Sequence, residues 1–191
     1  MKKIVCPFLL LGLLLTGCTK VNELNPGTSP VSGLESTGVN GPKAVAQTSY
    51  PYGAEIWISL GSAIPGGWVS IRSTGTSLLI KNMNGAPSGT EVWVLLGSPT
   101  LPGWVTLRSS GTSLLFKNMN GVSYGTETWV LLGSSIPSGW VSLRSSGTSL
   151  LIKNLNGAPR YTEIWVLLGS PIPSGWVTIR SSGTSVLIKK V

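Results

Sequence analysis

Three side chains that could contact a ligand recur along the chain at a spacing of 36 residues: a Glu, a Lys and a Trp. They supply a hydrogen-bond acceptor, a donor and a flat apolar ring. This combination suits a sugar, because an indole packs against its C–H face while polar groups bind its hydroxyls. The candidate ligand-binding residues are Trp68, Trp104, Trp140, Trp176, Glu55, Glu91, Glu127, Glu163, Lys81, Lys117, Lys153 and Lys189.

The residue types that are missing exclude most catalytic machinery. The sequence has no His and no Asp, and its acidic residues are six Glu. A Ser-His-Asp triad, a His-based metal site and an Asp-rich calcium loop therefore cannot be built. Glycoside hydrolysis usually needs two carboxylates in different environments, whereas the four repeated Glu are equivalent. No motif singles out a Ser–Lys nucleophile. We expect a non-catalytic protein without a metal or a cofactor.

The candidate residues belong to four copies of one unit. A second Trp and an Arg recur at the same spacing, at Trp57, Trp93, Trp129, Trp165 and at Arg72, Arg108, Arg144, Arg180. Such a period indicates a repeat architecture, in which each unit is one supersecondary motif. The units predict a domain over residues 51–191, divided at about 51–86, 87–122, 123–158 and 159–191.

Three short segments in each unit are rich in Val, Ile, Leu, Trp and Thr and are separated by Gly, Pro and Ser. This pattern predicts strands at 55–60, 68–73 and 77–82, with equivalents in the other units and no helix. The predicted fold class is all-β, with four three-stranded antiparallel repeats. A two-residue turn at Thr74-Gly75 would join the second and third strands.

Alternation of side chains divides each strand into two faces. One face is aliphatic, and we expect it to form the core: Ile56, Ile58, Leu60, Val69, Ile71, Leu78 and Ile80. The opposite face mixes rings with charge: Glu55, Trp57, Ser59, Trp68, Ser70, Arg72, Leu79 and Lys81. The predicted turn would pair Val69 with Ile80. It would also place Lys81 over Trp68 as a cation–π pair, and matching aliphatic positions would place Glu55 opposite Arg72.

The mixed face has two interpretations. In the structural one, it packs against the next repeat, with Trp rings filling the gap and Glu–Arg pairs neutralising charge. In the functional one, a ring in each unit stays accessible beside polar groups. Eight Trp of about 150–250 Å² each would exceed the apolar patch that a soluble monomer normally exposes. They cannot all lie on the surface.

The assembled array also has two interpretations. The link that follows residue 82 contains Gly85, Pro87 and Gly89 and is long enough to cross back over its sheet. We therefore expect a closed pseudo-fourfold array resembling a small propeller or prism. The alternative is an open stack, in which each unit contacts only its neighbours.

The first eighteen residues have the layout of an export signal. Lys2 and Lys3 precede a short apolar run, and small residues follow it. Leu15-Thr16-Gly17-Cys18 resembles the lipobox of bacterial lipoproteins, which implies cleavage before Cys18 and its acylation. The alternative is an ordinary secretory signal with a chance Cys. Residues 19–50 are rich in Pro, Gly, Ser and Thr and predict a flexible tether.

These observations lead to three hypotheses about function. The first is a multivalent, non-catalytic carbohydrate-binding lipoprotein, exported and held on the cell envelope, at the outer membrane or cell surface by the lipoprotein resemblance. Its partners would be the membrane, through the lipid anchor, and glycans or other envelope polymers. The second is a structural or protein-interaction lipoprotein, such as an adhesin or assembly factor. The third is polyanion binding, prompted by a net charge of +8, although one Lys per repeat disfavours nucleic acid.

Overall fold

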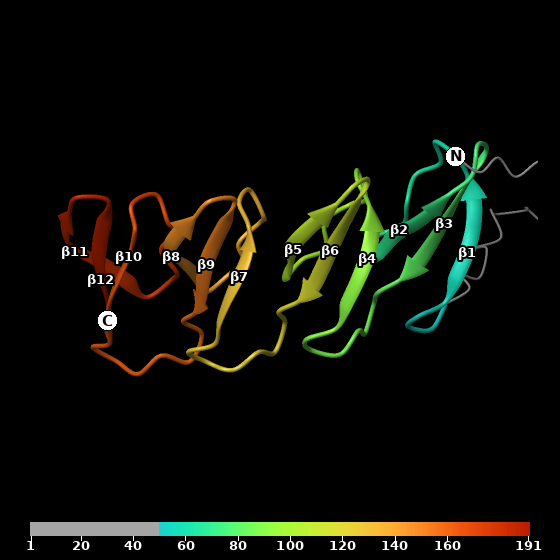
Figure 1. The fold of residues 1–191 in the computed structure, drawn as a ribbon. Coiled ribbons are helices and arrows are strands. Elements are labelled where there is room, and N and C mark those ends of the chain that lie inside the picture. Colours follow the sequence, from blue (N-terminus) through green and yellow to red (C-terminus); the bar gives the residue numbers. More distant parts are fainter. Residues whose placement is uncertain (1–49) are drawn as a thin grey trace, which may run out of the picture. The chain divides into compact units, whose positions relative to one another are not determined.

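The computed structural model describes residues 50–191, which form twelve strands and no helix (Figure 1). Each predicted repeat contains one three-stranded sheet. The strands are β1 (Glu55–Ser59), β2 (Trp68–Ser73), β3 (Ser77–Asn82), β4 (Glu91–Leu95), β5 (Trp104–Ser110), β6 (Ser113–Asn118), β7 (Glu127–Leu131), β8 (Trp140–Ser146), β9 (Ser149–Asn154), β10 (Glu163–Leu167), β11 (Trp176–Ser182) and β12 (Ser185–Lys190). The all-β repeat architecture is confirmed. Leu60, expected in the core, is 56% exposed because β1 ends at Ser59 and Leu60 begins a turn.

The third strand of each repeat lies in the centre of its sheet. The order is β1-β3-β2, and the same order recurs in the other three sheets. Both outer strands are antiparallel to the central one, so β1 and β2 run parallel to each other. The connection 60–67 therefore returns along the sheet before β2 begins. This return gives every repeat the same starting direction, so an odd number of strands does not reverse successive units.

A β-bulge in the second strand changes the predicted register. Trp68 pairs with Asn82 and Ser70 with Ile80, and the register then shifts so that Arg72 pairs with Leu79. The hairpin turn lies one residue later than predicted, because the N–H of Thr74 bonds to the carbonyl of Ser77. A shift of one residue moves side chains to the other face of a sheet. Trp68 consequently shares a face with Ile80, and the expected pairing of Val69 with Ile80 is wrong.

The core consists of clusters between successive sheets. In the first cluster, Val69 and Met83 of one repeat pack against Val94, Trp104 and Phe116 of the next. Equivalent residues form a cluster around Trp140 and another around Trp176. The second strand of each of the first three repeats is therefore buried on both faces where it begins, as Trp68 and Val69 are in β2.

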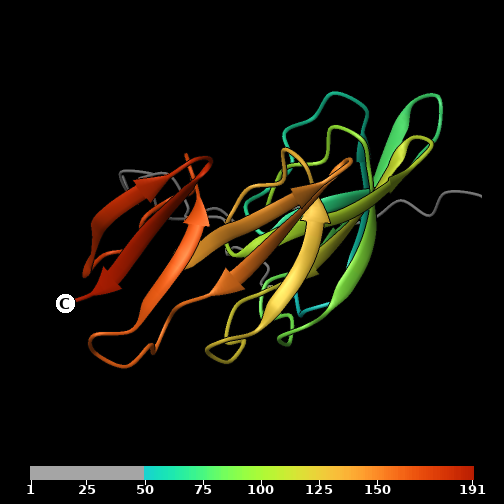
Figure 2. The same ribbon diagram turned by 60° about the vertical axis from the view of Figure 1, so that its left-hand side comes forward.

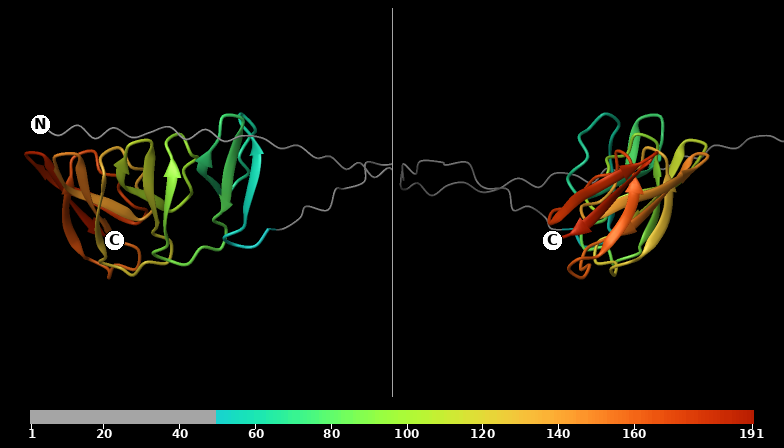
Figure 3. Two further views of the ribbon diagram at one scale, coloured as in Figure 1. Left: turned by 45° about the vertical axis from the view of Figure 1, so that its right-hand side comes forward. Right: turned by 90° about the vertical axis from the view of Figure 1, so that its left-hand side faces the viewer.

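Consecutive sheets contact each other, β2 with β4, β5 with β7 and β8 with β10. Among residues 50–191, the first and fourth sheets make no contact with each other, and Figures 2 and 3 show the four sheets following one another in a row. The expected closed array is therefore wrong, and the open stack describes the structure. Each of the second, third and fourth sheets packs its buried face on the preceding repeat, so the contacts run along the row without returning to the first sheet.

The leader 1–18 and the tether as far as residue 49 lie outside the described residues. Within residues 50–191, no helix is long and apolar enough to cross a membrane.

Candidate functional site

Each sheet has a second face, which carries an exposed indole beside a guanidinium. In the second repeat, Trp93 on β4 and Arg108 on β5 both pair with Leu115 on the central β6. The Arg108 Cζ lies 5.4 Å from the centroid of the Trp93 ring, which is a cation–π arrangement. The third and fourth repeats have the same arrangement at 5.5 Å, between Arg144 and Trp129 and between Arg180 and Trp165.

An ion pair lies beside each of these indoles. Glu91 is opposite Lys117 in the register, and Lys117 Nζ lies 3.0 Å from Glu91 Oε1. All four repeats contain this pair at 2.9–3.0 Å, with both side chains partly exposed. The expected pairing of Glu55 with Arg72 is wrong, because β3 lies between their strands and places Lys81 next to Glu55. A partly exposed pair stabilises the fold by only about 0.2–1 kcal/mol.

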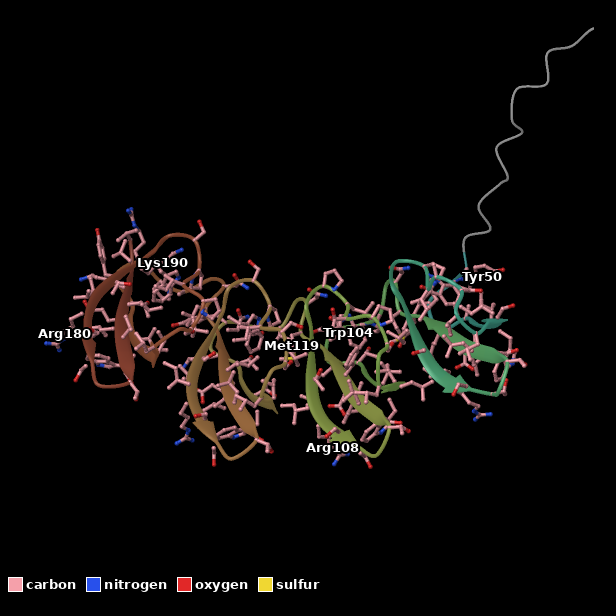
Figure 4. All side chains as sticks on the ribbon, turned by 90° about the horizontal axis from the view of Figure 1, so that it is seen from above. Tyr50, Trp104, Arg108, Met119, Arg180 and Lys190 are labelled. Atoms are coloured by element: carbon pink, nitrogen blue, oxygen red, sulfur yellow. The ribbon has the colours of Figure 1, made fainter. Side chains whose placement is uncertain are left out.

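The Trp residues expected to stack on a ligand are instead buried. Trp68, Trp104, Trp140 and Trp176 are only 2–7% exposed. Figure 4 shows Trp104 and Met119 within the row of sheets and the Arg108 and Arg180 side chains at its margins. The bulge explains the error, since it turns Trp68 away from Lys81 and toward the face that packs on other residues. The expected cation–π pair of Lys81 with Trp68 is absent from the described contacts for the same reason.

The accessible indoles belong to the other Trp set: Trp57, Trp93, Trp129 and Trp165, which are 39–51% exposed. Trp57 is the most open of them, and the stacking of an Arg over the ring is seen only in the other three described repeats. Sequence reasoning placed both sets on one mixed face and chose the set that the structure buries as the ligand-stacking one. The alternation of side chains along a strand does not reveal the bulge, which places the two Trp sets on opposite faces.

We define the indole face of a repeat by its exposed Trp, its Arg and its Glu–Lys pair. In the second repeat these are Trp93, Arg108, Glu91 and Lys117. The face offers a ring for apolar contact, a guanidinium with several donors and a carboxylate acceptor. Each carboxylate is already bound to a Lys, and residues 50–191 contain no group of three or more His, Cys, Asp or Glu that could hold a metal.

Residues 50–191 also contain pockets between neighbouring repeats, besides two pockets within the fourth repeat, one of which borders Trp165. One pocket between repeats is lined by Met83, Asn84, Trp104 and Asn120, among others. Asn amides could bind a ligand, but these are engaged by the backbone: Asn84 Nδ2 donates to the carbonyl of Gly66 and Asn120 Nδ2 to that of Pro102. The strand-end Asn118, which sequence reasoning did not single out, likewise donates to Ala86 and Pro87. These inter-repeat pockets therefore belong to the joints between repeats.

No family model matches the chain, and comparisons with curated proteins and with solved structures also give no match. The function is therefore inferred from the geometry of the repeats.

Proposed function

We propose that the repeat domain is a non-catalytic, multivalent carbohydrate-binding domain, with one weak site on the indole face of each repeat. The observation that supports this proposal is an accessible indole beside fixed polar groups, present four times in equivalent positions. The stacking residues are Trp57, Trp93, Trp129 and Trp165. The buried Trp set has a packing role.

The chemistry of the face supports a sugar ligand. A pyranose has an apolar face of C–H groups that packs against an indole, while its hydroxyls need donors and acceptors at the rim of the contact. Trp93 supplies the ring, Arg108 supplies donors, and Glu91 retains acceptor positions beyond its bond to Lys117. Each face is open, so a single contact is weak and affinity depends on engaging several repeats at once.

The location of the domain is part of the same proposal. The lipobox-like Leu15-Thr16-Gly17-Cys18 lies outside the described residues and supports export with acylation at Cys18. More than one acyl chain anchors a protein stably, since each buried CH₂ contributes about 0.8 kcal/mol. A tether of some thirty residues would then hold the repeats on the order of 30 Å from the bilayer. An envelope location would present the indole faces to surface glycans.

Binding to a polyanion is a second candidate, because the ion pairs leave the Arg side chains available. Residues 50–191 contain ten Lys and Arg but four Glu, and each Glu is bridged to a Lys. Every repeat therefore presents an exposed Arg that has no carboxylate partner in this part of the chain. A phosphate-rich or sulfated polymer would bind these guanidinium groups with a steep dependence on salt concentration.

A glycan-array screen of the full chain tests the proposal. The test variant carries Trp57→Ala, Trp93→Ala, Trp129→Ala and Trp165→Ala together. The matched control replaces another exposed apolar residue in each repeat, through Leu60→Ala, Leu96→Ala, Leu132→Ala and Leu168→Ala. We expect the wild type and the Leu control to bind the same glycans and the Trp variant to lose them.

Two outcomes would contradict carbohydrate binding through the indole face: no glycan bound by the wild type, or equal binding by the Trp variant. A salt titration separates the second candidate. Binding that changes little with salt supports neutral sugars, whereas affinity that falls by orders of magnitude supports the polyanion.

A further inference from the structure

The same interface joins every pair of neighbouring repeats. At each one, a Val of the second strand is buried against the next sheet: Val69, Val105 and Val141 are 0–1% exposed. A hydrogen bond accompanies it. The N–H of Ser70 donates to Ser98 Oγ at 3.0 Å, and equivalent bonds of 2.8 Å join Thr106 to Ser134 and Ser142 to Ser170. The second strand of one repeat and the first turn of the next are therefore complementary surfaces.

The second strand carries one side of this interface, which we call the donor surface because its N–H donates the hydrogen bond. In the fourth sheet this surface lies on β11, and no other sheet covers it among the described residues. Val177 and Ile179 on β11 are 42% and 49% exposed, whereas the equivalent Val141 is buried and Leu143 is half-buried. A repeat without a covering neighbour normally has a polar outer face. β11 instead keeps the aliphatic residues that the inner repeats use for packing. It is also a sheet edge, which tends to pair with other chains.

The other side of the interface, which we call the acceptor surface, contains the Ser that accepts this bond. The first sheet presents this surface. Ile58 is half-buried, while its equivalents Val94, Val130 and Val166 are 0–1% exposed. Ser62 is exposed, whereas its equivalent Ser98 is buried where it accepts the bond from Ser70. Tyr50 covers Trp68 in an edge-to-face contact at 5.4 Å, so part of the first core is already closed.

We propose that a second copy of this chain docks on β11 through its first repeat, by the interface that already joins the repeats within one chain. Val177 and Ile179 pack against the first sheet of the next copy, and the N–H of Thr178 donates to Ser62 Oγ of that copy. The two surfaces differ, so the contact is heterologous and can continue from copy to copy. This association does not depend on carbohydrate binding, but it would extend the row of indole faces.

Sedimentation velocity of the full 191-residue chain, over about a hundredfold range of concentration, tests the proposal. We expect the wild type to grow beyond a dimer as concentration rises. Val177→Lys with Ile179→Lys places charge on the donor surface and should leave a monomer. Leu96→Lys with Leu132→Lys adds the same charge at exposed apolar positions of inner repeats and should assemble like the wild type.

A mixing experiment tests the head-to-tail geometry. Ile58→Lys damages the acceptor surface, and Val177→Lys with Ile179→Lys damages the donor surface. Each variant alone should be monomeric, but an equimolar mixture retains one intact surface of each kind and should stop at a heterodimer. Ser62→Ala, a mild change at an exposed residue, should weaken wild-type assembly roughly fivefold, in line with the loss of one hydrogen bond.

Several results would overturn the proposal. One is a wild type that stays monomeric at every concentration, which includes the case in which residues 1–49 of the same chain cover β11. Another is a dimer that persists in the Val177→Lys, Ile179→Lys variant. A third is a wild-type dimer that does not grow, together with variants whose mixture stays monomeric, since this pattern indicates an isologous contact. Circular dichroism of each variant checks folding, and Ser62→Ala provides the test if a Lys variant unfolds.

Discussion

The two Trp residues of a repeat have opposite environments on one sheet. Trp104 begins β5 on the face that packs on the preceding repeat, and it is 6% exposed. Trp93 lies on β4, on the opposite face, and it is 41% exposed beneath Arg108. The following repeat contacts β5 but does not contact β4. The role of an indole here therefore depends on its position relative to the neighbouring repeat, since the residue type is the same in both places.

The largest expected difference between the two sets is in stability. Trp140 is 2% exposed and packs in the cluster that contains Val105, Met119 and Val130. Trp140→Ala should lower the free energy of unfolding by about 3–5 kcal/mol, because it removes a large buried ring. Trp129→Ala, at an exposed indole, should cost about 1 kcal/mol or less. Urea unfolding of the full chain measures both values, and equal losses would show that the two sets do not differ in packing.

A smaller effect concerns the glycine that precedes Trp104. Gly103 has φ 78°, and a Cβ at this position would overlap the Asn120 amide. Gly103→Ala should cost the 1–2 kcal/mol typical of a left-handed residue, plus about 0.5–1.5 kcal/mol for displacing Asn120 from its bond to Pro102. The matched control is Gly97→Ala, since Gly97 has φ 88° but open space around it.

Thermal and urea unfolding of the two Gly variants should therefore separate the cost of the left-handed backbone from the cost of the overlap with Asn120. The control, Gly97→Ala, should show the smaller loss of unfolding free energy. If Gly97→Ala destabilises the chain as much as Gly103→Ala does, the close approach of Asn120 to Gly103 contributes nothing to stability.

The smallest expected effect concerns the exposed set. Arg144→Met removes the guanidinium stacked on Trp129 but keeps much of the aliphatic stem, so it should cost about 0.5–1 kcal/mol. Arg72→Met is the control, because Arg72 is not stacked over Trp57 among the described contacts. The difference between the two unfolding free energies isolates the cation–π contribution. No difference would mean that the guanidinium only lies near the ring without stabilising it.

Much of the local structure could be predicted because it depends on local chemistry. The segments 68–73 and 77–82 match β2 and β3 in full, since runs of β-branched and apolar residues between Gly, Pro and Ser favour strands. The strand at 55–60 ends one residue early. The 36-residue period likewise predicted one sheet per repeat.

The candidate site was predicted only in part. Glu55 and Lys81 do lie on one accessible surface, as expected, but their partners were wrong because nothing in the spacing showed that β3 lies between β1 and β2. The Trp set was wrong because alternation assumes an uninterrupted strand. The bulge between Ser70 and Arg72 breaks that alternation in the middle of β2.

Composition and periodicity were enough to predict the strands, the four repeats and the types of ring and charge that each repeat carries. Which indole is buried, which cation meets each Glu and whether the array closes followed only from the packed fold. Those outcomes depend on strand order, on a one-residue shift in register and on the contact between successive sheets. All three arise from packing between segments that are distant in sequence, and local residue patterns do not encode such contacts.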